Sequence, residues 1–467
     1  MSRTIRFNAF EMTTPALHCP GLWRHPGDQS WRYKDLSYWS DLARLLERGI
    51  FDGIFIADVL GVYDVYRGTP DAALASATQV PVNDPLLMVS ALAQVTEHLG
   101  FGITASTSFE HPYPFARRMS TLDHLTRGRI GWNIVTSYLD SGARNVGQSG
   151  TLDHDQRYEY ADEYMEVLYK LWEASWDDDA VVRDAAANMF VDPSRVRPIR
   201  HEGQYFSVPG IHLCEPSPQR TPLLYQAGTS GRGKKFAVDH AESIFVSAPT
   251  TKLVRGQVAD VRNRLEAAGR DRGSIVVYSL CTIITGETGA AAQAKYDDYR
   301  RYADYRGVLA SWSGFLGHDL GAYDLDDPIE HIDSNAARSL ATAITRDDPD
   351  LHWTVRDLAA WGALGGPGPV ATGSPAQVAD QLQEWAAETD VDGFNVTFAV
   401  RPDSFADIVE YVVPELQRRG VYPASYQPGT LRDKLFGAGP RLPGDHRGAS
   451  YRPARVAGAA TAPSAAS

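Results

Sequence analysis

The sequence predicts an α/β fold in which eight parallel strands close into a (β/α)₈ barrel, the TIM barrel. Short apolar runs alternate with segments whose apolar residues recur at helical spacing, and this alternation is typical of a parallel sheet wrapped by helices. Eight strands, each followed by a helix, can be counted along the 467 residues. An open, doubly wound sheet has the same local pattern, but the count of eight favours the closed barrel.

The first half of the chain contains four of these strand and helix pairs. In the first helix, Leu36, Trp39 and Leu42 share one helical face, and Gly49 marks the end of the helix. The expected strands are residues 6–10, 51–57, 101–106 and 129–136. The expected helices are residues 33–48, 85–98, 115–125 and 158–172.

The same alternation continues in the second half. The expected strands are residues 222–226, 243–247, 275–284 and 393–399. The expected helices are residues 233–240, 252–268, 377–388 and 405–418. Three insertions, near residues 137–153, 176–218 and 305–375, are too long for a minimal barrel. Because the loops that follow barrel strands carry function, we expect these insertions to cover a site at the C-terminal face.

Residues 1–436 are expected to form a single domain, followed by a flexible C-terminal tail at 437–467. The tail is rich in Gly, Ala, Pro and Ser and has little apolar periodicity. We therefore expect it to be mobile or to lie over a partner subunit. The sequence leaves open whether the assembly is a homodimer or a homotetramer.

The composition limits the class of partner. The chain has 45 Lys and Arg against 58 Asp and Glu, a formal charge of −13, which argues against nucleic acid or an anionic membrane as the main partner. No segment approaches the roughly 20 apolar residues of a membrane helix, and no signal peptide is evident, so the expected location is the cytoplasm. Cys19, Cys214 and Cys281 are too far apart for a CxxC pair, and we expect reduced thiols.

Several kinds of catalytic motif are missing from the sequence. The 13 histidines are scattered, with no HxH and no HExxH, so we expect no catalytic metal. There is no GxSxG elbow of a serine hydrolase and no GxxxxGK[ST] phosphate loop. A serine hydrolase or a nucleoside-triphosphatase therefore has no anchor residue in this chain.

Two helix starts carry residues that suit a phosphate group. The segment 226–233 leaves a strand, passes through Gly228 and Ser230, and opens a helix, so backbone amides, a hydroxyl and an arginine can donate to an anion. At another helix start, His154 and Tyr158 are four residues apart and share one face, where both can donate to the same phosphate. Taken singly, each segment is also explained by a capped helix start with ordinary packing.

Polar residues also lie at the carboxyl ends of neighbouring predicted strands: Asp58, Thr104, Ser106 and Asn133. Together they can hold a heteroaromatic ring that has both donors and acceptors, although each alone could bond a loop backbone. Phe10, Phe55 and Phe245 lie at or near strands, where most aromatic rings belong to the core. We expect these three near a flat cofactor, in the substrate pocket.

Several longer motifs are shared with one enzyme family. They are GLWRHP at 21–26, ADVLG at 57–61, GRIGWNIVTS at 128–137, DHDQRY at 153–158, QAGTSGRG at 226–233 and VPELQRRG at 413–420. Together they resemble the nitrilotriacetate monooxygenase branch of the bacterial-luciferase-like flavin enzymes. The resemblance runs from about residue 7 to residue 437, which is nearly the whole chain.

This resemblance implies a TIM barrel that takes reduced FMN from a separate NAD(P)H:flavin reductase and uses O₂ to oxygenate a small organic substrate. It also implies that FMN is contacted by Asp58, Thr104, His154, Tyr158 and Ser230. Of these, His154, Tyr158 and Ser230 would lie at the phosphate. Ser106, Asn133 and Gly228 complete the expected cofactor site. Because FMN carries the oxygen chemistry, the protein needs neither a metal nor a nucleophile of its own.

Within this branch, residues 58–176 most resemble the dibenzothiophene-sulfone monooxygenases, which cleave an aromatic carbon–sulfur bond. The prediction is therefore oxygenation of an aromatic sulfone of the dibenzothiophene sulfone type, with C–S bond cleavage. Relatives with the same FMN motifs act on polyaminocarboxylates, alkanes or small sulfones, and these substrates remain alternatives. The alkane oxidisers carry a cysteine early in the first loop, where this chain reads EMTTP at 11–15, which argues against an alkane.

The catalytic residues are predicted only by position. His18 follows the first strand and His318 lies in the late insertion, so either could donate a proton to substrate, although each is also explained as a surface loop histidine. Two other functions remain open. One is an oxidoreductase that uses the deazaflavin F420 without consuming oxygen, and the other is a flavin-binding protein without turnover.

Overall fold

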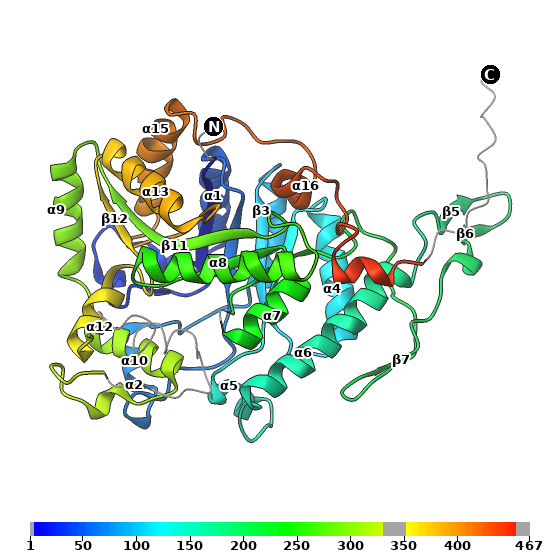
Figure 1. Ribbon diagram of the computed structural model, residues 1–467, viewed down its shortest axis with the longest axis horizontal. Helices are drawn as coiled ribbons and strands as arrows, with labels where there is room; N and C mark the ends of the chain where they lie inside the picture. The colour runs from blue at the N-terminus through cyan, green and yellow to red at the C-terminus, as the bar shows by residue number, and fades with distance from the viewer. Residues whose placement is uncertain (1–3, 229, 330–351, 454–467) are drawn as a thin grey trace.

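The computed structural model describes residues 4–228, 230–329 and 352–453, and its centre is a closed barrel of parallel strands (Figure 1). The eight strands follow one another around the barrel in sequence order, and β10 pairs with β11 to close it. They are β1 (Arg6–Met12), β2 (Gly53–Ala57), β3 (Gly100–Ser106), β4 (Ile130–Val135), β9 (Leu223–Gln226), β10 (Ser243–Val246), β11 (Val276–Thr285) and β13 (Gly393–Thr397). The predicted (β/α)₈ barrel is confirmed.

One strand of the sheet was not predicted. β12 (Val370–Gly373) pairs with the second half of β11, beyond the residues of β11 that pair with β10. It lies inside the insertion at 305–375. Its four residues include one threonine and one glycine and contain no apolar run, so the sequence pattern does not indicate a strand there.

A layer of helices covers the outside of the barrel. It consists of α1 (Leu36–Arg48), α3 (Val89–Gln94), α4 (Pro112–Leu125), α6 (His154–Tyr169), α7 (Gly231–His240), α8 (Thr251–Ala267), α9 (Gly289–Arg300), α13 (Pro375–Thr389), α14 (Asp403–Asp407) and α15 (Val413–Arg418). The helix expected at 85–98 is shorter than predicted, because it begins as a 3₁₀ turn, Pro85–Met88, and ends at Gln94. Within the described residues, no helix is both long and apolar enough to cross a membrane.

Further helices gather beyond the carboxyl ends of the strands. They are α2 (Asp71–Ser76), α5 (Asp140–Asn145), α10 (Tyr305–Leu316) and α12 (Val355–Trp361), at the lower edge of Figure 1. Tyr66, Val308 and Leu358 belong to one apolar cluster, which joins the segment after β2 to the insertion at 305–375. The insertion at 137–153 and the described parts of the insertion at 305–375 therefore lie at this face, together with the segment 58–84.

The third insertion, 176–218, lies elsewhere. It contains two small hairpins, β5 (Val181–Asp184) with β6 (Met189–Val191) and β7 (His201–Glu202) with β8 (Ser207–Val208). This segment follows a helix and precedes β9, so it leaves the barrel at the amino ends of the strands. We expected this insertion to cover a site at the C-terminal face, and the structure does not place it there.

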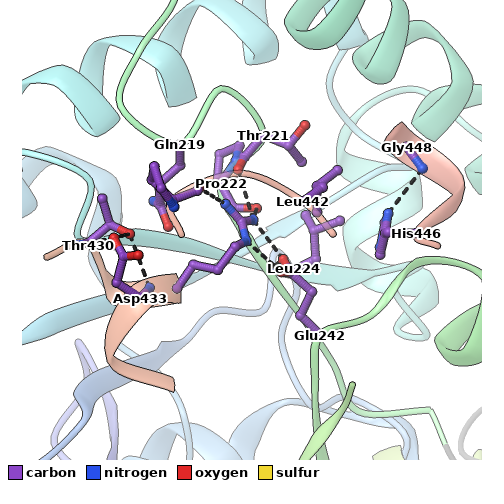
Figure 2. Close-up of polar contacts among 12 residues, drawn as sticks. Gln219, Thr221, Pro222, Leu224, Glu242, Thr430, Asp433, Leu442, His446 and Gly448 are labelled. Carbon is purple, nitrogen blue, oxygen red and sulfur yellow. Dashed lines mark hydrogen bonds and ion pairs between the residues drawn. The ribbon is translucent and has the colours of Figure 1, made fainter. Parts of the chain in front are cut away.

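α16 (Leu431–Phe436) closes the opposite, amino end of the barrel. Its Arg432 side chain is buried and donates to both carboxylate oxygens of Glu242, at 2.6 and 2.7 Å. The same guanidinium donates to the carbonyl oxygens of Thr221, Pro222 and Pro440. Figure 2 shows Thr221, Pro222 and Glu242 close together, with the Thr430 and Asp433 capping box nearby. The ion pair thus joins α16 to the starts of β9 and β10.

The chain after α16 packs on the barrel as far as it is described. His446 is 1% exposed, and its Nε2 lies 2.9 Å from the carbonyl oxygen of His240, at the end of α7. Arg452 donates to Glu173, which is buried. Residues 437–453 are thus packed on the barrel, whereas the sequence predicts a mobile segment. The difference arises because isolated buried side chains hold this segment, and such side chains produce no apolar period in the sequence. Residues 454–467 of the predicted tail lie outside the described residues.

Candidate functional site

A cavity of about 730 Å³ opens at the carboxyl ends of the barrel strands. Of the predicted site residues, those that line it are Phe10, His18, Phe55, Asp58, Thr104, Ser106, Asn133, His154, Tyr158, Gly228 and Phe245. Ser230 lies directly behind this wall, bonded to His154, and His318 lies away from the cavity. Residues from at least six strands thus meet at one place, as parallel strands in a barrel require.

The floor of the cavity is aromatic. The rings of Phe55 and Phe245 have centroids 4.3 Å apart, and Phe10 lies 5.0 Å from Phe55. Below them the ring of Tyr225 stacks on Phe245 at 5.5 Å. These residues alternate inward along their strands and fill the barrel interior, so the predicted pocket residues are at once core and cavity floor.

One wall carries a polar pair on adjacent strands. Thr104 on β3 and Asn133 on β4 are direct partners in the parallel register, and Nδ2 of Asn133 donates to Oγ1 of Thr104 at 3.0 Å. Oδ1 of Asn133 is buried and has no hydrogen-bond partner among the described residues. The amide oxygen of Gln226 on β9 is also buried and also has no hydrogen-bond partner among the described residues. Because a buried acceptor without a donor is costly, this wall is suited to a ligand that brings N–H groups.

The other end of the cavity is built on two helix starts. Ser230 caps α7, since its Oγ accepts from the backbone N–H of Gly233 at 3.0 Å, and the same Oγ lies 3.2 Å from Nε2 of His154. A β-carbon on Gly228 would lie 2.5 Å from the Tyr158 hydroxyl, and one on Gly233 would lie 2.8 Å from it. Both glycines are therefore needed to leave room beside the phenol. Hydroxyls, an imidazole and a helix N-terminus converge here, which is the donor set of a phosphate site.

The two predicted catalytic histidines differ in their surroundings. His18 is buried against the ring of Phe10, with centroids 5.0 Å apart, and its Nδ1 has no partner among the described residues. Burial lowers the pKa of His18 to about 4, so the imidazole is neutral at pH 7. His318 lies beyond the end of α10, with Nε2 2.7 Å from the hydroxyl of Tyr323, and it does not line the cavity. The structure thus does not place His318 where a catalytic role requires it.

Several cavity residues have no signal in the sequence. Phe315 comes from α10 and Pro367 from the loop before β12, so both reach the cavity only through the folding of the late insertion. Gln79 and Tyr138 come from other loops, and both bond the hydroxyl of Tyr63, at 3.0 and 2.6 Å. An apolar or amide residue in a loop has no pattern that indicates its role.

A comparison with known proteins identifies the family. A family model described as luciferase-like monooxygenase matches residues 14–393. The chain belongs to the luciferase-like monooxygenase family. The predicted relation to this family of flavin-dependent enzymes is confirmed, and the chain is a monooxygenase of that family.

Individual members of the luciferase-like monooxygenase family align over nearly the whole chain. The dimethyl-sulfide monooxygenase of Hyphomicrobium sulfonivorans is 51% identical over 457 residues, which cover 98% of this chain and 95% of the relative. The long-chain alkane monooxygenase of Geobacillus thermodenitrificans is 48% identical, covering 97% and 99%. The crystal structure of a riboflavin lyase with modified FMN and riboflavin has a TM-score of 0.90 at 37% identity, covering 97% of this chain and 100% of the other.

These sequence identities change which substrate is favoured among those predicted. The dibenzothiophene-sulfone monooxygenase of Rhodococcus erythropolis is 37% identical, over 91% of this chain and 95% of its own length. Two relatives named for dimethyl sulfide and for long-chain alkanes share more residues with this chain. The local likeness over residues 58–176 therefore does not single out an aromatic sulfone.

Asp58 has the most perturbed carboxyl group of the cavity wall. Burial raises its pKa to about 7, and the nearby charge of Asp84 acts in the same direction. Asp84 also lines the cavity, and its Oδ1 accepts from the backbone N–H of Leu86 at 2.9 Å. Near neutral pH, Asp58 is therefore divided between its charged and its protonated form.

Replacing Asp58 with asparagine is expected to change the pH dependence of stability. Between about pH 7 and pH 4, the folded protein holds a proton on Asp58 that the unfolded chain does not, so the contribution of Asp58 to wild-type stability rises as the pH falls through this range. The Asp58→Asn variant lacks this titration. Its melting temperature relative to wild type should be higher at pH 8 than at pH 5, as measured by thermal unfolding. An equal difference at both pH values would contradict the raised pKa.

Proposed function

We propose that this chain is the oxygenase of a two-component system that uses reduced FMN, delivered by a separate NAD(P)H:flavin reductase, and O₂. Its proposed substrate is a small, neutral organosulfur compound of the dialkyl-sulfide type. The main support for FMN as the cofactor is the cavity itself. It has an amide acceptor without a hydrogen-bond partner at one end and the two helix starts with phosphate-binding donors at the other. The 51% identity to a dimethyl-sulfide monooxygenase supports the choice of substrate.

The residues present fit FMN in two places. Asn133 and Thr104 would hold the polar edge of the isoalloxazine ring, because Asn133 keeps a buried oxygen that needs a donor. Gln226 keeps such an oxygen too, but its side-chain amide lies next to the Tyr158 hydroxyl, toward the phosphate end. Tyr158 and Ser230, together with the N–H groups that open α7, would hold the phosphate. His154 bonds Ser230 and completes that end.

The protein's own contribution is orientation and exclusion of water. Reduced FMN, when bound, supplies the two electrons with which one atom of O₂ enters the substrate and the other leaves as water. The aromatic floor of Phe10, Phe55 and Phe245 keeps the reacting space apolar. His18 is neutral, buried and open to the cavity, so it can hold a proton at one ring nitrogen and direct it toward the substrate.

The charges on the cavity wall favour a neutral substrate over a polyaminocarboxylate. Asp58, Asp84 and Glu110 bring carboxylates to the wall. The guanidinium of Arg118 is paired with both oxygens of Glu110, at 2.6 and 3.0 Å, so it is already compensated. A substrate with several carboxylates would therefore meet Asp84 and the charged form of Asp58 as like charges. Arg157 also lines the cavity, and its guanidinium already donates to the carbonyl oxygen of Ser137.

An aromatic sulfone of the dibenzothiophene sulfone type, oxygenated with cleavage of the C–S bond, is the second candidate. The three phenylalanine rings of the floor can pack against a fused aromatic substrate. The 37% identity to a dibenzothiophene-sulfone monooxygenase adds to this observation.

Product analysis under ¹⁸O₂ tests the function and separates the candidates. The purified protein, a flavin reductase, FMN and NADH are incubated with dimethyl sulfide, dibenzothiophene sulfone or hexadecane, and products are analysed by mass spectrometry. We expect labelled oxygen in a product of dimethyl sulfide. A labelled phenol from the sulfone would establish the second candidate instead. If FMN binds but no oxygen is consumed with any of these substrates, the proposed oxygenase activity on them is wrong.

A further inference from the structure

The phosphate end of the cavity is supported by a network of buried polar groups that reaches the C-terminal segment. We call Arg232, Asp162, His240 and Tyr169 the Asp162 network. The guanidinium carbon of Arg232 lies 5.4 Å from the centroid of the Tyr158 ring. Nη1 of Arg232 is buried and has no partner among the described residues, while Nη2 donates to Oδ2 of Asp162. One arginine nitrogen is thus held by Asp162, and the guanidinium lies over the ring of Tyr158, which lines the cavity.

Asp162 uses both of its carboxylate oxygens within this network. Oδ2 accepts from Arg232, and Oδ1 lies 3.1 Å from Nε2 of His240. Nδ1 of His240 lies 3.0 Å from the hydroxyl of Tyr169, so both nitrogens of this imidazole are occupied. Because each group has one orientation that satisfies its partners, a shift of His240 changes the position of Asp162 and therefore that of Arg232.

The C-terminal segment 440–453 packs on the far end of the network. Nε2 of His446 bonds the carbonyl oxygen of His240 at 2.9 Å, and the ring of Tyr451 stacks on Tyr169 with centroids 5.7 Å apart. Figure 2 shows His446 facing Gly448, whose N–H donates to Nδ1 of His446 at 3.0 Å. A β-carbon on Gly448 would lie 2.6 Å from the Tyr169 ring. The segment is therefore fitted closely to Tyr169 and His240.

We infer that segment 440–453 is a positioning element for the cofactor phosphate, acting through the Asp162 network on Arg232. This inference rests on the proposed FMN site and names the residues that hold it in place. None of the residues of the segment lines the cavity. Their effect on FMN must therefore be indirect. We expect it to be specific to the phosphate, because Arg232 lies over the ring of Tyr158, and Tyr158 lines that end of the cavity.

The ratio of the affinities for FMN and riboflavin distinguishes a variant that misplaces the phosphate contacts from one that only loosens the fold. Riboflavin lacks the phosphate, so a variant that only loosens the fold should weaken both ligands alike. We expect Asp162→Asn to lower the affinity for FMN about tenfold, since it removes one charge-assisted contact to Arg232, and to leave the affinity for riboflavin unchanged. His446→Ala should lower the FMN affinity roughly threefold or more, in the same selective way.

Two further variants complete the experiment. Tyr169→Phe removes only the hydroxyl that bonds His240, and it tests the network even if Asp162→Asn fails to fold. Lys235→Ala breaks an exposed ion pair with Asp239 on the same helix and serves as the matched control, which should keep wild-type affinities. All variants are measured in the full chain by quenching of flavin fluorescence, with thermal unfolding as the check on folding.

The outcomes separate this inference from the proposed function. If wild type binds FMN no more tightly than riboflavin, the proposed phosphate site itself is wrong. If wild type prefers FMN and the folded Asp162→Asn, Tyr169→Phe and His446→Ala variants keep that preference, the positioning role is wrong and the cofactor assignment stands. An equal loss in Lys235→Ala would also overturn the positioning role.

Discussion

Combining Tyr158→Phe with Ser230→Ala is expected to lower the affinity for FMN by roughly a hundredfold or more. Each substitution removes one hydroxyl at the helix starts, and a hydrogen bond to a charged group contributes about 1.5 to 3 kcal/mol. Because the two groups act on the same phosphate, the double variant has a larger effect than either single one. The measurement is titration of the purified variant with FMN, followed by flavin fluorescence.

The loss of a helix cap needs its own control in this experiment. Ser230 also caps α7, so Ser230→Ala lowers stability by about 1 kcal/mol as well. Thr250 caps the neighbouring α8 in the same way, and it does not line the cavity. Thr250→Ala should therefore reduce stability to a similar extent while leaving the FMN affinity intact. Unchanged FMN affinity in the double variant would refute the phosphate assignment.

Arg432→Met is expected to destabilise the fold by about 3 to 5 kcal/mol, because it leaves the buried carboxylate of Glu242 without its partner. The substitution also removes the donor to the carbonyl oxygens of Thr221, Pro222 and Pro440 (Figure 2). Urea unfolding followed by tryptophan fluorescence measures the difference. The cavity lies at the other end of the barrel, so the folded fraction should keep its FMN affinity.

Two companion variants show whether the buried charge is the cause. Glu242→Gln in the Arg432→Met background removes that charge and should restore part of the lost stability. Arg418→Ala breaks an ion pair with Glu415 on the surface, where Arg418 is 70% exposed, and should have no measurable effect. If Arg432→Met were as stable as Arg418→Ala, the ion pair would have no structural role at the amino end of the barrel.

Much of the site follows from where polar residues occur along the strands. Asp58, Thr104 and Asn133 were predicted to converge because parallel barrel strands end at one face, and the structure places all three on one cavity. Gly228 was predicted to belong to a helix start whose backbone amides can donate to an anion, and the structure places it against Tyr158. These inferences depend only on the order of strands and helices, which local patterns determine.

The remaining parts of the site come from contacts between segments far apart in the chain. His318 lies away from the cavity, and Phe315, three residues before it, lines the cavity, because the direction of α10 decides which of the two faces the barrel. Likewise, the insertion at 176–218 follows a helix and so starts at the amino ends of the strands, and Phe206 of its second hairpin packs on Tyr160, on the outside of α6. The direction of α10 has no local signal, whereas the place where the insertion starts follows from the predicted helix before it and the predicted strand after it.

The sequence alone determined the barrel and the family, because apolar period and motif spacing are properties of neighbouring residues. For the same reason it could predict which residues are expected at both ends of a flavin. Only the tertiary structure decided how the C-terminal segment packs, since it is held by single buried groups such as His446 and Arg452. The same holds for the raised pKa of Asp58 and the lowered pKa of His18. Both shifts are caused mainly by burial, and burial depends on distant segments that a local pattern does not contain.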